Sequence, residues 1–162
     1  MILGGPNGEL SASLQYLNQR YFAPTNRAKA ILTDIGTEEL GHLEMVATMV
    51  YQLTEGLTPE EWADAGLGGM FVENGGIMYV NPDGIPWTAA YLNSPGDPVA
   101  TFVSNMAAEE RARSTYENLI RLTDDPDVKE PLRFLREREI VHFQRFGETL
   151  NYLQEYNIKK PV

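Results

Sequence analysis

One pattern of glutamate and histidine occurs twice in this sequence, with an offset of 100 residues. Each copy has a first glutamate, a second glutamate 30 residues later and a histidine three residues further on. The residues are Glu9, Glu39 and His42 in the first copy and Glu109, Glu139 and His142 in the second. The offset also matches neighbouring positions, namely Tyr16 with Tyr116, Leu32 with Leu132 and Ile35 with Leu135. Such an internal repeat predicts two similar helix pairs related by a pseudo-twofold axis.

The second glutamate and the histidine of each copy form a Glu-x-x-His motif. Residues three apart on a helix share a face, so each motif projects a carboxylate and an imidazole in one direction. The apolar seam of the helix passes through that face, with Ile35 and Val46 around the first motif and Leu135 and Phe146 around the second. We therefore expect both motifs to point into the core.

Hydrophobic periodicity and helix-ending residues predict four helices. They span about residues 6–22, 26–54, 98–123 and 126–156. Thr25, Asp97 and Asp125 stand where N-caps are needed, and a proline at the first helical position follows each of the two aspartates. Because Pro131 interrupts the last stretch, we expect regular helix to begin there only at this residue.

Residues 55–97 are rich in glycine and proline but also carry many apolar side chains, with short helices expected at 59–65 and 87–92. A connection of this length predicts a segment that covers the core or a subunit interface rather than a linker. Two pairs of long helices joined by such a crossover indicate an all-α, ferritin-like four-helix bundle. We expect residues 1–162 to form one such domain, which binds two metal ions.

Composition excludes several classes of function. The chain has no cysteine, which rules out a disulfide framework, a thiolate metal site and a cysteine nucleophile. Its net charge of −10 repels phosphate backbones, so we expect no nucleic-acid partner. No apolar run approaches the ~20 residues of a membrane span, and no signal peptide is recognisable, so we expect no membrane partner and a cytoplasmic location.

The repeated residues are the ligand types that a pair of divalent cations requires. One glutamate from each of two helices, with Glu-x-x-His from each of the other two, is a known dinuclear ligand set in bundle cores. Four buried glutamates without cations would cost many kcal/mol, whereas two divalent ions supply four positive charges. We expect the remaining helix glutamates near the pattern to lie on solvated faces; these are Glu38, Glu44, Glu110 and Glu137.

Tyr16 and Tyr116 lie two turns beyond the first glutamate of each copy. We expect them to pack in the core with a hydrogen-bonded hydroxyl. The alternative is that they reach toward the metal site.

Three stretches of the sequence, residues 4–10, 32–45 and 132–143, resemble the manganese catalases. The similarity is greater to the short branch that includes spore-coat catalase-like proteins, and it covers nearly the whole chain. It departs at Ala108, where some members carry arginine. The first helix of the family starts well upstream of its glutamate, whereas only eight residues precede Glu9 here, so we expect either that an N-terminal piece is missing or that this form builds half of that helix.

The resemblance implies a ferritin-like bundle in which two manganese ions disproportionate hydrogen peroxide to water and dioxygen. It implies that Glu39 bridges the ions and that Glu139 stands in the outer shell as a proton-handling base. The metal ligands that it implies are Glu9, Glu39, His42, Glu109 and His142. It also implies a homo-oligomer, usually a hexamer, and a spore-coat location if the source forms spores.

Two alternatives to the catalase stay open at this point. The ligand set also suits a di-iron ferroxidase or oxygen-activating protein, because metal availability decides much of the choice between manganese and iron. A structural spore-coat component that keeps the bundle without catalysis is the other. All six pattern positions are filled, which favours a working metal site.

Overall fold

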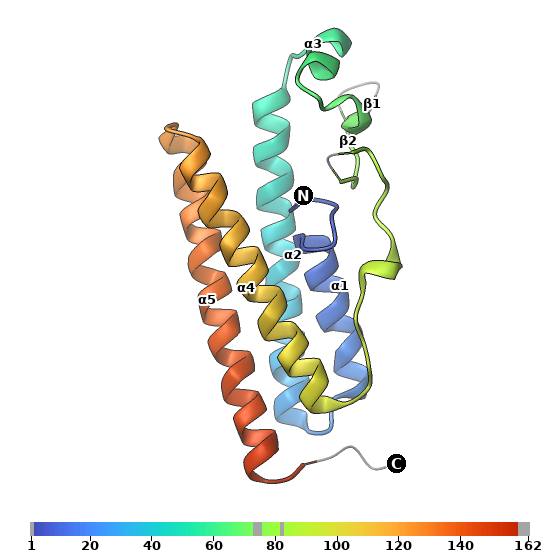
Figure 1. The fold of residues 1–162 in the computed structure, drawn as a ribbon, viewed down its shortest axis with the longest axis vertical. Coiled ribbons are helices and arrows are strands. Elements are labelled where there is room, and N and C mark those ends of the chain that lie inside the picture. Colours follow the sequence, from blue (N-terminus) through green and yellow to red (C-terminus); the bar gives the residue numbers. More distant parts are fainter. Residues whose placement is uncertain (1, 73–75, 82, 159–162) are drawn as a thin grey trace.

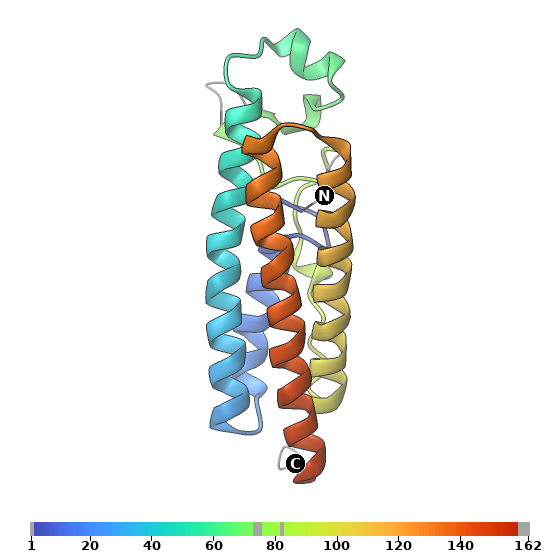
Figure 2. The ribbon, with the colours of Figure 1, turned by 90° about the vertical axis from the view of Figure 1, so that its left-hand side faces the viewer.

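The structure is a computed structural model that describes residues 2–72, 76–81 and 83–158, and four long helices lie side by side in it (Figure 1). The helices are α1 (Glu9–Gln19), α2 (Asn26–Thr54), α4 (Pro98–Leu122) and α5 (Pro126–Glu155). Helices α1 and α2 form one antiparallel pair and α4 and α5 the other, with α5 between α2 and α4 in Figure 2. This arrangement confirms the all-α four-helix bundle of the ferritin-like kind.

The predicted capping residues start the helices. The side chain of Thr25 accepts a hydrogen bond from the amide of Ala28, and Asp97 and Asp125 cap α4 and α5 in the same way. These bonds satisfy backbone donors that a helix N-terminus leaves free. The range predicted for α2 is the observed one, and α4 and α5 each end one residue earlier than predicted.

Two helix predictions were wrong. The first helix does not begin at Pro6, because the preceding residues form turns and α1 starts at Glu9; a 3₁₀ turn, η1 (Arg20–Phe22), follows it. Regular helix in α5 begins at Pro126, five residues before Pro131. Pro131 lacks a backbone N–H, so it removes one backbone hydrogen bond near the start of the helix. The N-cap at Asp125 and the proline at the first helical position stabilise the first turn.

The crossover runs along the α1 side of the bundle (Figure 1). It contains α3 (Pro59–Asp64), the 3₁₀ turns η2 (Gly68–Met70) and η3 (Ala89–Tyr91), and a two-stranded antiparallel pair of β1 (Phe71–Val72) with β2 (Gly76–Ile77). The helix expected at 59–65 is therefore present, and a 3₁₀ turn replaces the one expected at 87–92. Residues 73–75 and 82 of the crossover lie outside the described residues.

Polar contacts fasten the crossover to the bundle. The indole Nε1 of Trp87 donates to the hydroxyl of Ser11 on α1 at 3.0 Å. The N-terminal segment also lies against it, because a Cβ at Gly4 would stand only 2.5 Å from the backbone of Tyr79 and Val80. Only glycine permits this approach. No helix of the described ranges is long and apolar enough to cross a membrane.

The apolar core consists of two clusters. One holds buried residues from the later part of α2, the later part of α4 and the start of α5, among them Val46, Ile120 and Leu132. The other lies around Phe102 and Phe146. On α2, α4 and α5 the residues of the repeated glutamate and histidine pattern come between the two clusters, so apolar packing closes the bundle on both sides of the pattern.

The pseudo-twofold symmetry is broken at one end. Leu153 is 1% exposed among Leu32, Phe102 and Phe146, whereas its repeat counterpart Leu53 is 60% exposed. The reason is the length of the flanking helices. Helix α4 begins well before Glu109 and its first turns cover Leu153, whereas α1 begins at the first pattern glutamate and provides no such turns over Leu53.

Candidate metal centre

The structure brings all six pattern residues together at mid-height of the bundle. They come from four different helices, and none is more than 3% exposed. The six are Glu9 on α1, Glu39 and His42 on α2, Glu109 on α4, and Glu139 and His142 on α5. The convergence follows from the seam positions of the two motifs, as the sequence predicted.

Glu39 lies between the two imidazoles. Its Oε1 is 2.7 Å from Nδ1 of His142, and its Oε2 is 2.8 Å from Nδ1 of His42. The imidazole rings stack with centroids 5.5 Å apart and an interplanar angle of 20°. Both Nδ1 atoms therefore face the same central carboxylate.

The other carboxylates complete the group. The Oε2 of Glu9 is 3.8 Å from Nδ1 of His42, and the Oε2 of Glu109 is 3.5 Å from Nδ1 of His142. The Oε1 of Glu139 is 3.9 Å from Nδ1 of His42. Each motif residue offers a ligand atom within 4.8 Å of those of the other three motif residues. One glutamate thus stands beside each imidazole, with Glu39 and Glu139 near both.

Both readings of the two tyrosines hold, because they pack in the apolar core with hydrogen-bonded hydroxyls, as expected, and those hydroxyls also reach the site. The hydroxyl of Tyr16 donates to Oε1 of Glu109, and the hydroxyl of Tyr116 donates to Oε1 of Glu9. Each tyrosine therefore orients the glutamate of the other helix, and the pseudo-twofold axis relates the two hydrogen bonds. Each hydrogen bond uses Oε1 of the glutamate and leaves its Oε2 facing an imidazole.

Burial and crowding of like charges disturb the titration of the site. Burial first, and then neighbouring carboxylates, raises the pKa of Glu9 and of Glu139 well above its usual range, and burial also raises the pKa of Glu39. Burial lowers the pKa of His42. Burial acts in the same direction on His142, but contacts with Glu109 and Glu39 outweigh it and raise its pKa to about 10.

The donor set fits divalent cations. Several buried ligand-type atoms have no hydrogen-bond partner within the protein: Oε1 of Glu39, Oε2 of Glu109, Oε1 of Glu139, Nε2 of His42, and Nδ1 and Nε2 of His142. Buried polar atoms without partners are costly, and an unpaired carboxylate is more so. Carboxylate oxygens and imidazole nitrogens are suitable ligands for manganese and iron. Two divalent ions would balance the four carboxylates and give partners to the three carboxylate oxygens and to Nδ1 of His142.

The glutamates expected on solvated faces divide into two groups. Glu44, Glu110 and Glu137 lie away from the site as predicted. The prediction was wrong for Glu38, which is half-buried and pairs with Arg138 of α5. A sequence signal did exist, because Glu38 and Arg138 occupy the same repeat position, directly before the second glutamate of each copy.

A cavity of about 310 Å³ adjoins the site between α1 and α4. Glu9 and Glu139 line it, together with small residues that leave the space open: Gly8, Ser11, Ala12, Ala108 and Ala112. The cavity therefore reaches two of the site carboxylates.

A ring of amide hydrogen bonds fixes the wall of this cavity. Gln15 donates to Asn105 at 3.0 Å, Asn105 to Gln19 at 2.7 Å, and Gln19 to the carbonyl of Asn93 at 2.6 Å. The amide of Asn93 donates back to Gln15 at 2.7 Å and closes the ring. The ring joins α1, α4 and the crossover, and its members are too far apart in sequence for a motif to reveal it.

Comparison with known proteins identifies relatives of this chain. The family model described as manganese containing catalase matches residues 1–162. Protein CotJC of Bacillus subtilis is 52% identical over 160 residues, which are 98% of this chain and 84% of that protein. A probable manganese catalase of Clostridium acetobutylicum is 40% identical over 159 residues, which are 98% of this chain and 71% of that one.

A solved structure has the same fold. The crystal structure of KatB, a manganese catalase from Anabaena, superposes with a TM-score of 0.84 at 39% sequence identity. The match covers 94% of this chain and 69% of that one.

Proposed function

Because the chain belongs to the family of manganese-containing catalases, we propose that it disproportionates two molecules of hydrogen peroxide to two of water and one of dioxygen, with two bound manganese ions. The observation that carries the proposal is the convergence of six buried carboxylate and imidazole side chains on one centre beside a cavity. A solvent-facing arrangement of Glu9 or Glu109 would have left no such centre.

The geometry suggests how the residues share the ions. Glu9 and His42 would hold one ion, and Glu109 and His142 the other, since each of these pairs brings Oε2 near Nδ1. Glu39 would bridge, because its two oxygens face the two imidazoles separately. Manganese ions bound there supply Lewis acidity and the change of oxidation state that a two-electron reaction of peroxide needs.

Glu139 is our candidate for the proton-handling base. It lines the cavity through which a small substrate reaches the centre, and its Oε1 has no hydrogen-bond partner within the protein. Peroxide that enters there meets this carboxylate beside the ligand group. Glu139 can take a proton from one peroxide and return it to the oxygen that leaves as water, which is general acid–base catalysis.

The rest of the chain holds the geometry and limits access. Tyr16 and Tyr116 fix the orientation of Glu109 and Glu9, so these two ligands need no reorganisation when charge changes at the centre. The apolar clusters on both sides exclude bulk water. The cavity has room for a molecule of the size of peroxide beside Glu9 and Glu139.

Elemental analysis and oxygen evolution on one sample test the proposal. The protein is expressed in manganese-supplemented medium, and bound manganese and dioxygen released per peroxide consumed are measured. We expect manganese in the protein and one dioxygen for every two peroxides. A manganese-loaded sample that releases no dioxygen would refute the catalase.

The same experiment separates the two alternatives. An iron-loaded sample that oxidises ferrous iron or activates dioxygen, while the manganese form stays inactive, would establish the di-iron reading. Inactivity with both metals would favour a structural coat component. That alternative has one observation behind it, since Protein CotJC, 52% identical, carries no activity in its name.

A further inference from the structure

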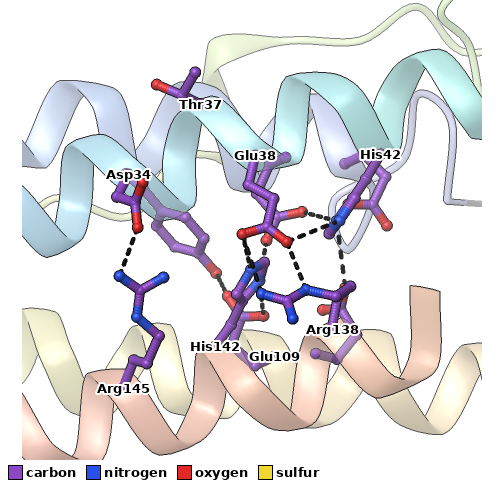
Figure 3. A network of polar contacts seen from close by, with 12 residues as sticks. Asp34, Thr37, Glu38, His42, Glu109, Arg138, His142 and Arg145 are labelled. Atoms are coloured by element: carbon purple, nitrogen blue, oxygen red, sulfur yellow. Dashed lines mark hydrogen bonds and ion pairs between the residues drawn. The ribbon is translucent and has the colours of Figure 1, made fainter. Parts of the chain in front are cut away.

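Glu38 lies on the outer side of both imidazoles. Its Oε2 is 3.1 Å from Nε2 of His142, and its Oε1 is 3.5 Å from Nε2 of His42 (Figure 3). Among the described residues it is the one carboxylate within 4 Å of either Nε2 atom. The Nδ1 atoms of the same rings face the central carboxylates instead. Each imidazole therefore has a ligand side and an outer side, and Glu38 lies on the outer side of both, within ion-pair distance of Nε2 but without a hydrogen bond to it.

Arg138 fixes Glu38 in this place. The guanidinium donates from Nε to Oε1 at 2.6 Å and from Nη2 to Oε2 at 3.3 Å, which is a two-pronged contact from α5 to α2. A guanidinium in this position favours the carboxylate form of Glu38, which can accept hydrogen bonds but not donate them.

The charge of the pair suits a site that already holds four carboxylates. Glu38 alone would add a fifth negative charge beside the centre, and Arg138 cancels it. The two residues of the ion pair occupy the same position of the repeat. The first copy has glutamate there and the second copy has arginine. The two repeat counterparts thus meet and form one neutral pair at the seam between α2 and α5.

A neutral imidazole that carries its proton on Nε2 presents its lone pair from Nδ1. An acceptor at Nε2 fixes that tautomer and the ring orientation, and raises the basicity of the ligating nitrogen. We propose that Glu38, held by Arg138, is a positioning residue for both histidines, and that it directs both Nδ1 atoms to the metal ions. This inference rests on the proposed dinuclear site and adds a residue outside the six positions of the repeated pattern.

The alternative is an ordinary ion pair that only joins two helices. The chain contains a matched example in the pair of Asp34 and Arg145, which links the same helices one turn away at 2.5 Å (Figure 3). Neither imidazole lies within ion-pair distance of Asp34. The substitution Asp34→Asn therefore removes a contact between α2 and α5 without touching the histidines.

The first test compares manganese affinity in Glu38→Gln and Asp34→Asn. Glutamine keeps the size of the side chain but has a single acceptor oxygen, so it cannot serve both Nε2 atoms. We expect Glu38→Gln to bind at least one manganese ion about 10- to 100-fold more weakly, and Asp34→Asn to bind as the unaltered chain does. Equal affinity in all three proteins would overturn the proposal.

The second test reads the imidazoles directly. Zinc accepts the same ligand types and is diamagnetic, so ¹⁵N spectra of zinc-loaded protein show which ring nitrogen carries the metal and which the proton. We expect metal on Nδ1 and a slowly exchanging proton on Nε2 of both histidines, and faster exchange of at least one of these protons in Glu38→Gln. Metal on Nε2, or unchanged exchange in the variant, would overturn the proposal.

Arg138→Lys keeps the positive charge but loses the two-pronged contact. We expect its metal affinity and exchange rates to fall between those of the unaltered chain and Glu38→Gln, and this variant replaces Glu38→Gln if the latter fails to fold. Values equal to those of the unaltered chain would exclude the holding role of Arg138. Failure of the proposed function is distinguishable, because it would appear in the unaltered chain as missing metal or missing oxygen evolution.

Discussion

His142 and Glu139 lie one turn apart on α5, yet their removal should have different effects. His142→Ala deletes a buried imidazole donor, so we expect bound manganese to fall and oxygen evolution to drop to background. Glu139→Gln keeps size and hydrogen bonding but cannot accept a proton. We expect its manganese content to survive while turnover drops about 100-fold or more.

Elemental analysis and oxygen evolution on both variants decide between these roles. Loss of manganese from Glu139→Gln as complete as from His142→Ala would make Glu139 a ligand. The centre would then have the symmetric ligand set of di-iron proteins, which would favour the oxygen-activating alternative over the catalase.

The buried carboxyl groups also predict how the metal-free protein responds to pH. Because burial raises the pKa of Glu9, Glu39 and Glu139, and contacts with carboxylates raise the pKa of His142 to about 10, the folded state binds more protons than the unfolded state above about pH 4.5. The contribution of these groups to the free energy of unfolding is therefore fully present at low pH, and it is lost as the pH rises through their raised pKa values. The slope is about 1.4 kcal/mol per pH unit for each extra proton.

Urea denaturation of the metal-free protein from pH 5 to 8 measures this effect. We expect the free energy of unfolding to decrease with pH, although the lowered pKa of His42 works in the opposite direction for one group. Saturating manganese should reverse the trend, because metal binding requires deprotonated ligands. Metal-free stability that rises with pH over this range would contradict the prediction.

At the scale of helices, the broken symmetry predicts unequal costs for equal substitutions. Leu153→Ala removes a buried side chain next to Phe102 and should lower the free energy of unfolding by about 2–5 kcal/mol. Leu53→Ala, at the counterpart position, should cost less than about 1 kcal/mol because that side chain is mostly exposed. Denaturant midpoints of the two variants measure the difference, and similar losses would contradict the unequal coverage.

The cavity between α1 and α4 predicts a second helix-scale effect. Ala108→Leu would fill space beside Glu9 and Glu139, so kcat/KM for peroxide should fall about tenfold or more, at unchanged manganese content. Ala107→Leu is the matched control, because Ala107 is exposed on the same helix and does not line the cavity. Oxygen evolution at several peroxide concentrations measures both, and equal rates would place substrate entry elsewhere.

At the scale of the whole molecule, the crossover presents apolar side chains that the bundle does not cover. Met78, Tyr79 and Ile85 are each about half exposed on one stretch of chain. We propose that this stretch is buried against other copies of the chain, in agreement with the homo-oligomer that the family resemblance implies. Exposed apolar groups of this kind mark association surfaces.

Light scattering of the metal-loaded protein measures the association. We expect an oligomer for the unaltered chain and smaller species for a Met78→Lys, Ile85→Lys double variant, because lysine is costly to bury. Leu122→Lys controls for surface charge, since Leu122 is 82% exposed outside the crossover. A monomeric unaltered chain would contradict the prediction.

The sequence by itself determined the four long helices and the six residues that meet at the centre. Both are set by local information, because the seam of a helix follows from its period of 3.6 residues and a cap acts within one turn. The repeat added the one non-local fact, that two such pairs are equivalent. These features therefore required no knowledge of which helix lies against which.

The tertiary structure decided the contacts between elements that are distant in sequence. The crossed bonds of Tyr16 and Tyr116, the place of Glu38 beside both imidazoles and the amide ring around Asn93 each need a neighbour from another helix or from the crossover. The different exposure of Leu53 and Leu153 likewise depends on where the flanking helix begins. Such contacts follow from packing in three dimensions, and the side-chain types and periodicity of one helix do not predict them.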